Sequence, residues 1–274
     1  MPNAENATPD PPMIRTEGLT KRFGDFTAVA DITISIARGE IFGLIGANGS
    51  GKTTLVKMLT TLLPPSAGSA TVAGFDIVRQ AAEVRRHIGY VPQLLSADGS
   101  LTGYENMLLS ARLYATPRRE RETRIREALK ALGLADAADR LVQHYSGGMI
   151  RRLEIAQSML HRPSILFMDE PTVGLDPLAR DAVWEHTRDL RRTYGMTLLI
   201  TTHYLDEADQ LCDRIAIMRQ GRVAAIGTPA ALKAEIGPNA TLDDVLSRLN
   251  AAETETQGGY SDARRERITA VTHG

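Results

Sequence analysis

Short apolar runs separated by polar turns recur along the chain, and they predict a core rich in β-strands. The runs Ile41–Ile45 and Ile165–Met168 are almost wholly apolar, which is typical of strands buried on both faces. The other segments that we expect to be strands are Met13–Thr20, Ile32–Ala37, Ser69–Val72, His87–Val91, Thr197–Thr202, Arg214–Arg219 and Val223–Ile226.

Helical spacing of apolar residues appears between these strands. It covers Thr53–Leu63, where two consecutive prolines then end the helix, and it continues from about Leu101 to Leu160. Thr102 followed by Glu105 is typical of a capping box at a helix start. Strands and helices that alternate on both sides of a helical stretch favour an α/β core with a mainly parallel sheet and an inserted helical subdomain.

Composition narrows the choice of protein class. The chain has 274 residues, 43% of them hydrophobic and 24% charged, with a net charge of −1, which is ordinary for a globular protein. Without a global basic field we expect no nucleic-acid partner. Cys212 is the single cysteine, which excludes an intramolecular disulfide and favours a buried, inert thiol.

The termini carry little patterning. No apolar stretch reaches the roughly 18 residues that a membrane span needs. Residues 1–12 are polar and rich in proline, so we expect a flexible tail and no signal peptide there. Thr241–Leu249 could form one more helix, whereas the polar stretch Ala251–Gly274 is expected to be mobile.

A glycine-rich segment between a predicted strand and a predicted helix fits the phosphate-binding pattern G-x-x-x-x-G-K-[ST]. Its glycines let successive backbone amides point at phosphate oxygens, and the helix start adds partial positive charge. We expect Lys52 to reach the β- and γ-phosphates of ATP and the Thr53 hydroxyl to ligate Mg²⁺. The candidate nucleotide-binding residues are Gly46, Asn48, Gly49, Ser50, Gly51, Lys52, Thr53 and Thr54.

Two acids follow the buried strand at residues 165–168, at the strand end where α/β sheets bind ligands. Asp169 is the expected partner of Mg²⁺, through water. Glu170 is placed to polarise the attacking water as general base. Together with the phosphate loop, these acids indicate a P-loop ATPase.

Further motifs resemble those of one family, the ATP-binding subunits of ABC transporters. The segment Tyr145-Ser146-Gly147-Gly148-Met149 resembles the ABC signature motif. Gln93 is similar to the Q-loop glutamine, His203 to the switch histidine, and Phe23 to the aromatic residue that stacks on adenine. Gly174-Leu175-Asp176-Pro177 resembles the D-loop. With the phosphate loop and the two acids, the resemblance covers roughly residues 13–230.

The resemblance implies a mechanism. ABC ATPases work as head-to-tail dimers that hold two ATP molecules between them, so a homodimer, or a pair of ATPase subunits, is expected. The phosphate loop, Asp169 and Glu170 of one protomer would face Ser146, Gly147 and Gly148 of the other, and Asp176 would lie beside them. His203 would contact the γ-phosphate, and Gln93 would ligate the metal as a catalytic residue and sense its site.

The expected fold is therefore α/β, a P-loop NTPase core with a mainly parallel sheet, an antiparallel β-subdomain and an inserted helical subdomain. The expected organisation places a flexible tail at 1–12, the ATPase domain at 13–235 with its helical subdomain at about 94–160, and a partly disordered extension at 236–274.

Two departures from the family pattern stand out: Met149 ends the signature in place of glutamine, and Phe23 replaces the usual tyrosine. The signature, the following Arg-Arg-Leu-Glu and the segment Thr202–Asp209 look like those of the daunorubicin-resistance exporter ATPases. That subgroup pairs with a separately encoded permease, usually of the ABC-2 type, and exports drugs, antibiotics, lipids or polysaccharides. The resemblance thus implies a peripheral protein at the cytoplasmic face of the membrane.

Three alternatives stay open at the level of sequence. An importer subunit would share the same core. A non-transport ABC protein usually carries two ATPase cassettes or a long coiled coil, and the sequence shows neither. A P-loop GTPase would need an Asn-Lys-x-Asp segment, which is absent from the sequence.

Overall fold

The computed structural model describes residues 10–251. Its larger sheet has the strand order β11-β10-β4-β9-β8-β7, and all neighbouring strands run parallel except the pair β10 and β11. This confirms the mainly parallel sheet. Its strands are β4 (Ile41–Ile45), β7 (Ile88–Val91), β8 (Ile165–Asp169), β9 (Thr197–Thr202), β10 (Arg214–Arg219) and β11 (Arg222–Gly227).

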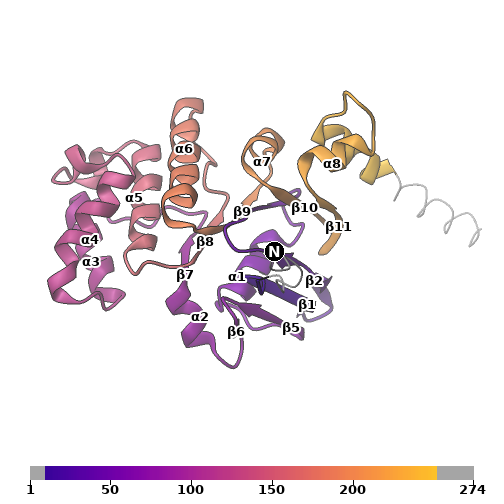
Figure 1. Cartoon of the computed structure of the whole chain (residues 1–274), viewed down its shortest axis with the longest axis horizontal. Coiled ribbons are helices and arrows are strands. Elements are labelled where there is room, and N and C mark those ends of the chain that lie inside the picture. Colours follow the sequence, from indigo (N-terminus) through magenta and orange to yellow (C-terminus); the bar gives the residue numbers. More distant parts are fainter. Residues whose placement is uncertain (1–9, 252–274) are drawn as a thin grey trace, which may run out of the picture.

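A second, antiparallel sheet has the order β2-β1-β5-β6, with β3 also paired to β1. It confirms the expected antiparallel part of the fold. The helix α1 (Lys52–Leu59) contacts both this sheet and β8 of the larger one, and Figure 1 shows it beside the antiparallel strands. The strands are β1 (Ile14–Phe23), β2 (Phe26–Ile32), β3 (Ser35–Ile36), β5 (Ala67–Val72) and β6 (Phe75–Asp76).

The helices are spread around the two sheets (Figure 1). In Figure 1, α3, α4 and α5 lie together at one end of the molecule, while α7 and α8 lie toward the other. The capping box is confirmed, because Thr102 accepts from the amide of Glu105 and the Glu105 side chain accepts from the amide of Thr102. The helices besides α1 are α2 (Ala81–His87), α3 (Gly103–Leu113), α4 (Arg118–Ala131), α5 (Gly147–Met159), α6 (Pro177–Tyr194), α7 (Leu205–Leu211) and α8 (Pro229–Ala234).

Strands β4, β8 and β9 of the larger sheet are buried on both faces, as their continuous apolar runs predict, whereas the edge strand β11 is partly exposed. In β4, Ile41 and Ile45 belong to a core shared with α3 to α7, whereas Phe42 and Leu44 belong to a core shared with α1 and the antiparallel sheet. In β8, Phe167 likewise faces the second core. Because both faces are covered, polar side chains can reach solvent only where the strands end.

The structure corrects several expected boundaries. The strand expected at Ile32–Ala37 is reduced to β3, because the Thr16 hydroxyl donates to the Ile32 carbonyl and accepts from the Ile34 amide, which bends the chain there. The helix expected to reach Leu63 ends at Leu59, since Thr61 takes a left-handed backbone angle (φ 63°). Strands β2 and β6 and helices α2, α6, α7 and α8 were not predicted.

The C-terminal part of the described chain packs on the main core. Residues 242–251 are helical, as expected for Thr241–Leu249, and Leu242 and Val245 are buried in the main core. Residues 1–9 and 252–274, which cover most of the expected tail and the stretch expected to be mobile, lie outside the described residues. Among residues 10–251, no helix combines the length and the apolar character of a membrane span.

Cys212 lies at the end of α7, where its sulfur packs against Gly43 of β4, and a Cβ on that glycine would come within 2.7 Å of Sγ. Burial raises the pKa of the Cys212 thiol to about 12, so the thiolate is almost absent at neutral pH.

We therefore expect no reaction of native protein with a disulfide reagent at pH 8, and one equivalent per chain in denaturant. Equal labelling rates in the two conditions would contradict the burial of this thiol.

Candidate active site

The loop between β4 and α1 curls around the Lys52 side chain. The Lys52 ammonium donates to the carbonyls of Gly46 at 2.7 Å and Ala47 at 3.3 Å. Gly51 has φ 105°, and a Cβ there would come within 2.5 Å of the Ala28 carbonyl, so only glycine fits this turn. Together these contacts fix a ring of backbone around a single cation.

The start of α1 presents open donors to a cleft of about 450 Å³. Its N-cap, Gly51, makes no side-chain cap, and its first turn holds no acid, so the first amides remain free to bind an anion. The buried Ser50 hydroxyl has no hydrogen-bond partner among the described residues, as expected of a group that binds a ligand. The cleft is lined by Phe26, Ala28, Asn48, Gly49, Ser50, Gly51, Lys52, Thr53, Thr54, Gln93 and Glu170.

Oxygen atoms suited to a metal ion gather beside this loop. The Thr53 hydroxyl donates to Asp169 Oδ1 at 3.2 Å, and the Thr201 hydroxyl donates to the same oxygen at 2.6 Å. Gln93, from the loop after β7, lines the same cleft. These three side chains, Thr53, Asp169 and Gln93, are the ones predicted from sequence as metal ligands, and their oxygens are of the kind that Mg²⁺ prefers.

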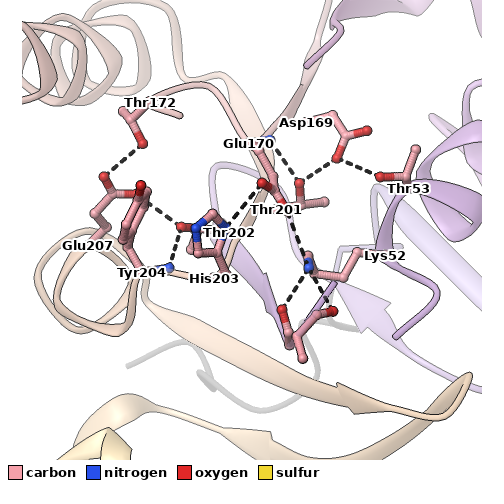
Figure 2. A network of polar contacts seen from close by, with 12 residues as sticks. Lys52, Thr53, Asp169, Glu170, Thr172, Thr201, Thr202, His203, Tyr204 and Glu207 are labelled. Carbon is pink, nitrogen blue, oxygen red and sulfur yellow. Dashed lines mark hydrogen bonds and ion pairs between the residues drawn. The ribbon is translucent and has the colours of Figure 1, made fainter. Parts of the chain in front are cut away.

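Glu170 lies at the centre of the polar network in Figure 2. Its backbone is left-handed (φ 49°), and its amide is held by the Thr201 carbonyl at 3.1 Å and hydroxyl at 2.9 Å. One carboxylate oxygen is 3.3 Å from the Lys52 ammonium, and the other is 3.1 Å from His203 Nδ1. Because a carboxylate only accepts, the Nδ1 atom carries the proton in this contact.

A second buried acid, Glu207 of α7, holds the segment behind His203. It accepts hydrogen bonds from Thr172 at 2.7 Å and Thr202 at 3.0 Å (Figure 2). It also lies 3.3 Å from Arg180 of α6. The Tyr204 ring packs on both the Arg180 guanidinium and the His203 ring. Glu207 was not among the predicted site residues, although it lies in the segment Thr202–Asp209 that resembles the exporter ATPases, on the helix that follows β9 and His203.

An aromatic residue that was not predicted, Phe26 of β2, lines the cleft. Phe23 of β1, expected to stack on adenine, is absent from its lining. The two residues face each other across the β1–β2 hairpin, so both rings project from the same face of the sheet. Lys21 lies 5.3 Å from the centre of the Phe23 ring. Sequence analysis missed Phe26 because it did not predict β2.

The signature residues and Asp176 do not line this cleft. The Ser146 hydroxyl caps α5 by accepting from the Met149 amide, and Asp176 caps α6 by accepting from the Ala179 amide. These two helix starts touch, because a Cβ on Gly148 would lie only 2.7 Å from Cβ of Ala179. Within one chain, therefore, the structure brings together the phosphate loop, Asp169, Glu170, Gln93 and His203, and leaves the signature residues apart.

Comparisons with known proteins agree with this geometry. The sequence profile of the ABC transporter family matches residues 29–173. The daunorubicin/doxorubicin resistance ATP-binding protein DrrA of Streptomyces peucetius is 45% identical, over 87% of this chain and 73% of that protein.

Solved structures share the fold. An ATP-binding subunit of an ABC transporter superposes with a TM-score of 0.76 at 30% identity, over 87% of this chain and 99% of that one. A dimeric ATP-binding cassette in a post-hydrolysis state, bound to ADP and phosphate, superposes with a TM-score of 0.70 at 27% identity, over 79% of this chain and 98% of that one. The chain belongs to the ATP-binding subunits of the ABC transporter family.

Proposed function

We propose that this chain hydrolyses ATP to power export through an ABC transporter. The observation that carries the proposal is the placement of one carboxylate, Glu170, between Lys52 and His203 at the mouth of a phosphate-binding loop. Within one cleft, these groups provide a cation that binds phosphate, a general base for water, and a histidine that orients the general base.

The phosphate loop binds the nucleotide. The open amides of the first turn of α1 and the buried Ser50 hydroxyl supply donors, and the Lys52 ammonium supplies the charge. Lys52 shares its charge with Glu170, so a γ-phosphate would compete with that carboxylate for the ammonium. The Phe26 ring, beside Phe23, offers a flat apolar surface to the adenine ring of the nucleotide.

Thr53, Asp169 and Gln93 would hold Mg²⁺. When bound, the ion neutralises charge on the phosphate oxygens. Among the described residues, no group of three or more His, Cys, Asp and Glu side chains is arranged to hold a metal. This fits Mg²⁺ in nucleotide sites, where few protein ligands suffice because the phosphates supply the others.

Glu170 is the candidate general base. It is 6% exposed, and the Thr201 contacts fix its backbone, so its carboxylate is held in one position. His203 donates through Nδ1 to this carboxylate, which leaves Nε2 to accept a hydrogen bond from water when the ring is neutral, or to donate one to a γ-phosphate when the ring is protonated. The Thr202–Glu207 contact fixes the strand end that carries His203.

We further propose that two copies complete each site. Ser146 lies outside the cleft of its own chain, at the start of a helix whose amides Gly147 and Gly148 can bind an anion. Ser146 of the partner subunit would then close the cage around the γ-phosphate. The dimeric cassette bound to ADP and phosphate, which shares this fold, supports the arrangement.

The proposed transport partner is a membrane permease of the ABC-2 type, at the cytoplasmic face of the membrane. The relative DrrA is named for resistance to daunorubicin and doxorubicin, which favours export of a drug-like cargo. The loop after Gln93 exposes Leu94 and Leu95, whose exposed fractions are 81% and 49%, next to the helical subdomain. Apolar side chains exposed in this way are suited to a protein contact.

Replacing Glu170 by glutamine keeps the shape of the side chain and removes the base. We expect turnover of ATP by the Glu170→Gln chain to fall by about a hundredfold or more, with binding of ATP retained. Steady-state hydrolysis and equilibrium nucleotide binding measure the two effects. Glu127→Gln, an exposed acid on α4, is the control and should behave as wild type. Turnover at the wild-type rate in Glu170→Gln would exclude this residue as the base.

Replacing Lys52 by alanine removes the cation of the phosphate loop. We expect the Kd for ATP to rise by about tenfold to a hundredfold, because a charge-assisted hydrogen bond to phosphate is lost. Lys57→Ala is a matched control, since Lys57 lies exposed on the last turn of the same helix. Fluorescence titration of both variants makes the comparison, and an unchanged affinity in Lys52→Ala would refute the assignment.

A further inference from the structure

A buried ion pair on α5 lies outside the groups assigned so far. Arg151 and Glu154 are 2% and 4% exposed, and the Arg151 guanidinium lies 3.1 Å from the Glu154 carboxylate. Their spacing of three residues puts them on one face of the helix. That face points at the loop that follows β7 and carries Gln93.

The pair holds this loop at two points. The Arg151 guanidinium donates to the Pro92 carbonyl at 2.6 Å and to the Gln93 carbonyl at 2.7 Å. The Glu154 carboxylate accepts from both the backbone amide and the hydroxyl of Ser96. The residues between these anchors, Leu94 and Leu95, point into solvent with exposed fractions of 81% and 49%.

Burying this ion pair costs free energy, so its presence points to a role other than packing. Burial raises the pKa of Glu154 and lowers that of Arg151, because both charged forms lose contact with water. Hydrogen bonds and the partner charge offset this loss, and nearby Asp169 also favours the cation of Arg151. A hydrophobic pair of similar volume would pack at least as well.

We propose that Arg151 and Glu154 act as positioning residues that tie the Gln93 loop to the signature helix. We call this pair the loop clamp. It rests on the proposed function, in which Gln93 serves the metal side of the cleft and α5 begins at the serine that meets the second nucleotide. Any shift of α5 on closure of the dimer would then carry the loop, its glutamine and its exposed leucines with it.

The contacts of Arg151 and Glu154 are enough to hold the Gln93 loop in one position. Both sets of contacts include hydrogen bonds to the backbone of the loop and neither uses the Gln93 side chain, so they fix the path of the loop and leave that side chain free to face the cleft. Both come from one turn of a single rigid helix, so they move together. The loop clamp therefore links the site of one nucleotide to the signature residues that serve the other.

The test uses the full chain with Arg151→Met and Glu154→Leu combined, because removing both charges avoids leaving one buried without a partner. We expect kcat for ATP to fall by about tenfold or more, since Gln93 loses its fixed position. We also expect a higher Mg²⁺ concentration for half-maximal turnover. The affinity for ATP should stay unchanged, because the phosphate loop makes no contact with the clamp. The control is Arg126→Met with Glu122→Leu, an exposed pair on α4.

Adding Gln93→Ala to the clamp variant distinguishes an effect through Gln93 from a general structural effect. If the clamp acts through Gln93, the triple variant should show no greater loss of kcat and no greater Mg²⁺ requirement than Gln93→Ala alone. Additive losses would overturn the proposal, and so would wild-type kinetics in the clamp variant. Neither result would touch the assignment of Glu170, which the Glu170→Gln variant tests separately.

Amide hydrogen exchange of the wild-type chain gives a readout that needs no variant. The Ser96 amide donates to a buried carboxylate, so it should exchange more slowly than the amides of Leu94 and Leu95. In a clamp variant whose thermal unfolding is still cooperative, that protection should vanish. Equal exchange at Ser96 and Leu95 in the wild-type chain would overturn the clamp even if the variants fail to fold.

Discussion

Neighbouring parallel strands end at the same edge of a sheet, and the whole site depends on this constraint. In the order β4-β9-β8, Ile45 lies opposite Thr202 and Asp169 lies opposite Thr201. The segments that leave these strand ends are the phosphate loop, the two acids and the loop with His203. Because the apolar strands are locked between two cores, their register is fixed, and the three loops must meet within hydrogen-bond distance.

The meeting point is a single carboxylate with two competing partners. Lys52 and Glu170 are almost fully buried, and each would be costly to bury alone. Their contact at 3.3 Å, with His203 on the other carboxylate oxygen, satisfies all three groups before any substrate is considered. A phosphate that draws Lys52 toward itself weakens one of these contacts and frees a carboxylate oxygen for water. Binding and chemistry are thereby linked through one side chain.

Much of the fold and of the site could be predicted from sequence, because Asp169 and His203 lie at the ends of apolar strands and Lys52 lies in a glycine-rich motif that follows one. The remainder depends on contacts between distant segments. Strand β2 was not predicted because its apolar residues do not alternate regularly, and for the same reason the cleft residue Phe26 was not predicted. Arg151, three residues before Glu154, has the spacing of an ordinary exposed helical pair, and only packing of the Gln93 loop shows that it is buried.

The central claim is that two copies of the chain share each nucleotide, and a structure of the Glu170→Gln variant solved with Mg²⁺ and ATP tests it most directly. The expected result is a dimer in which Ser146 of the partner subunit lies about 3 Å from the γ-phosphate that Lys52 holds. A nucleotide-loaded single copy, or a dimer with every Ser146 distant from the nucleotide, would contradict the claim.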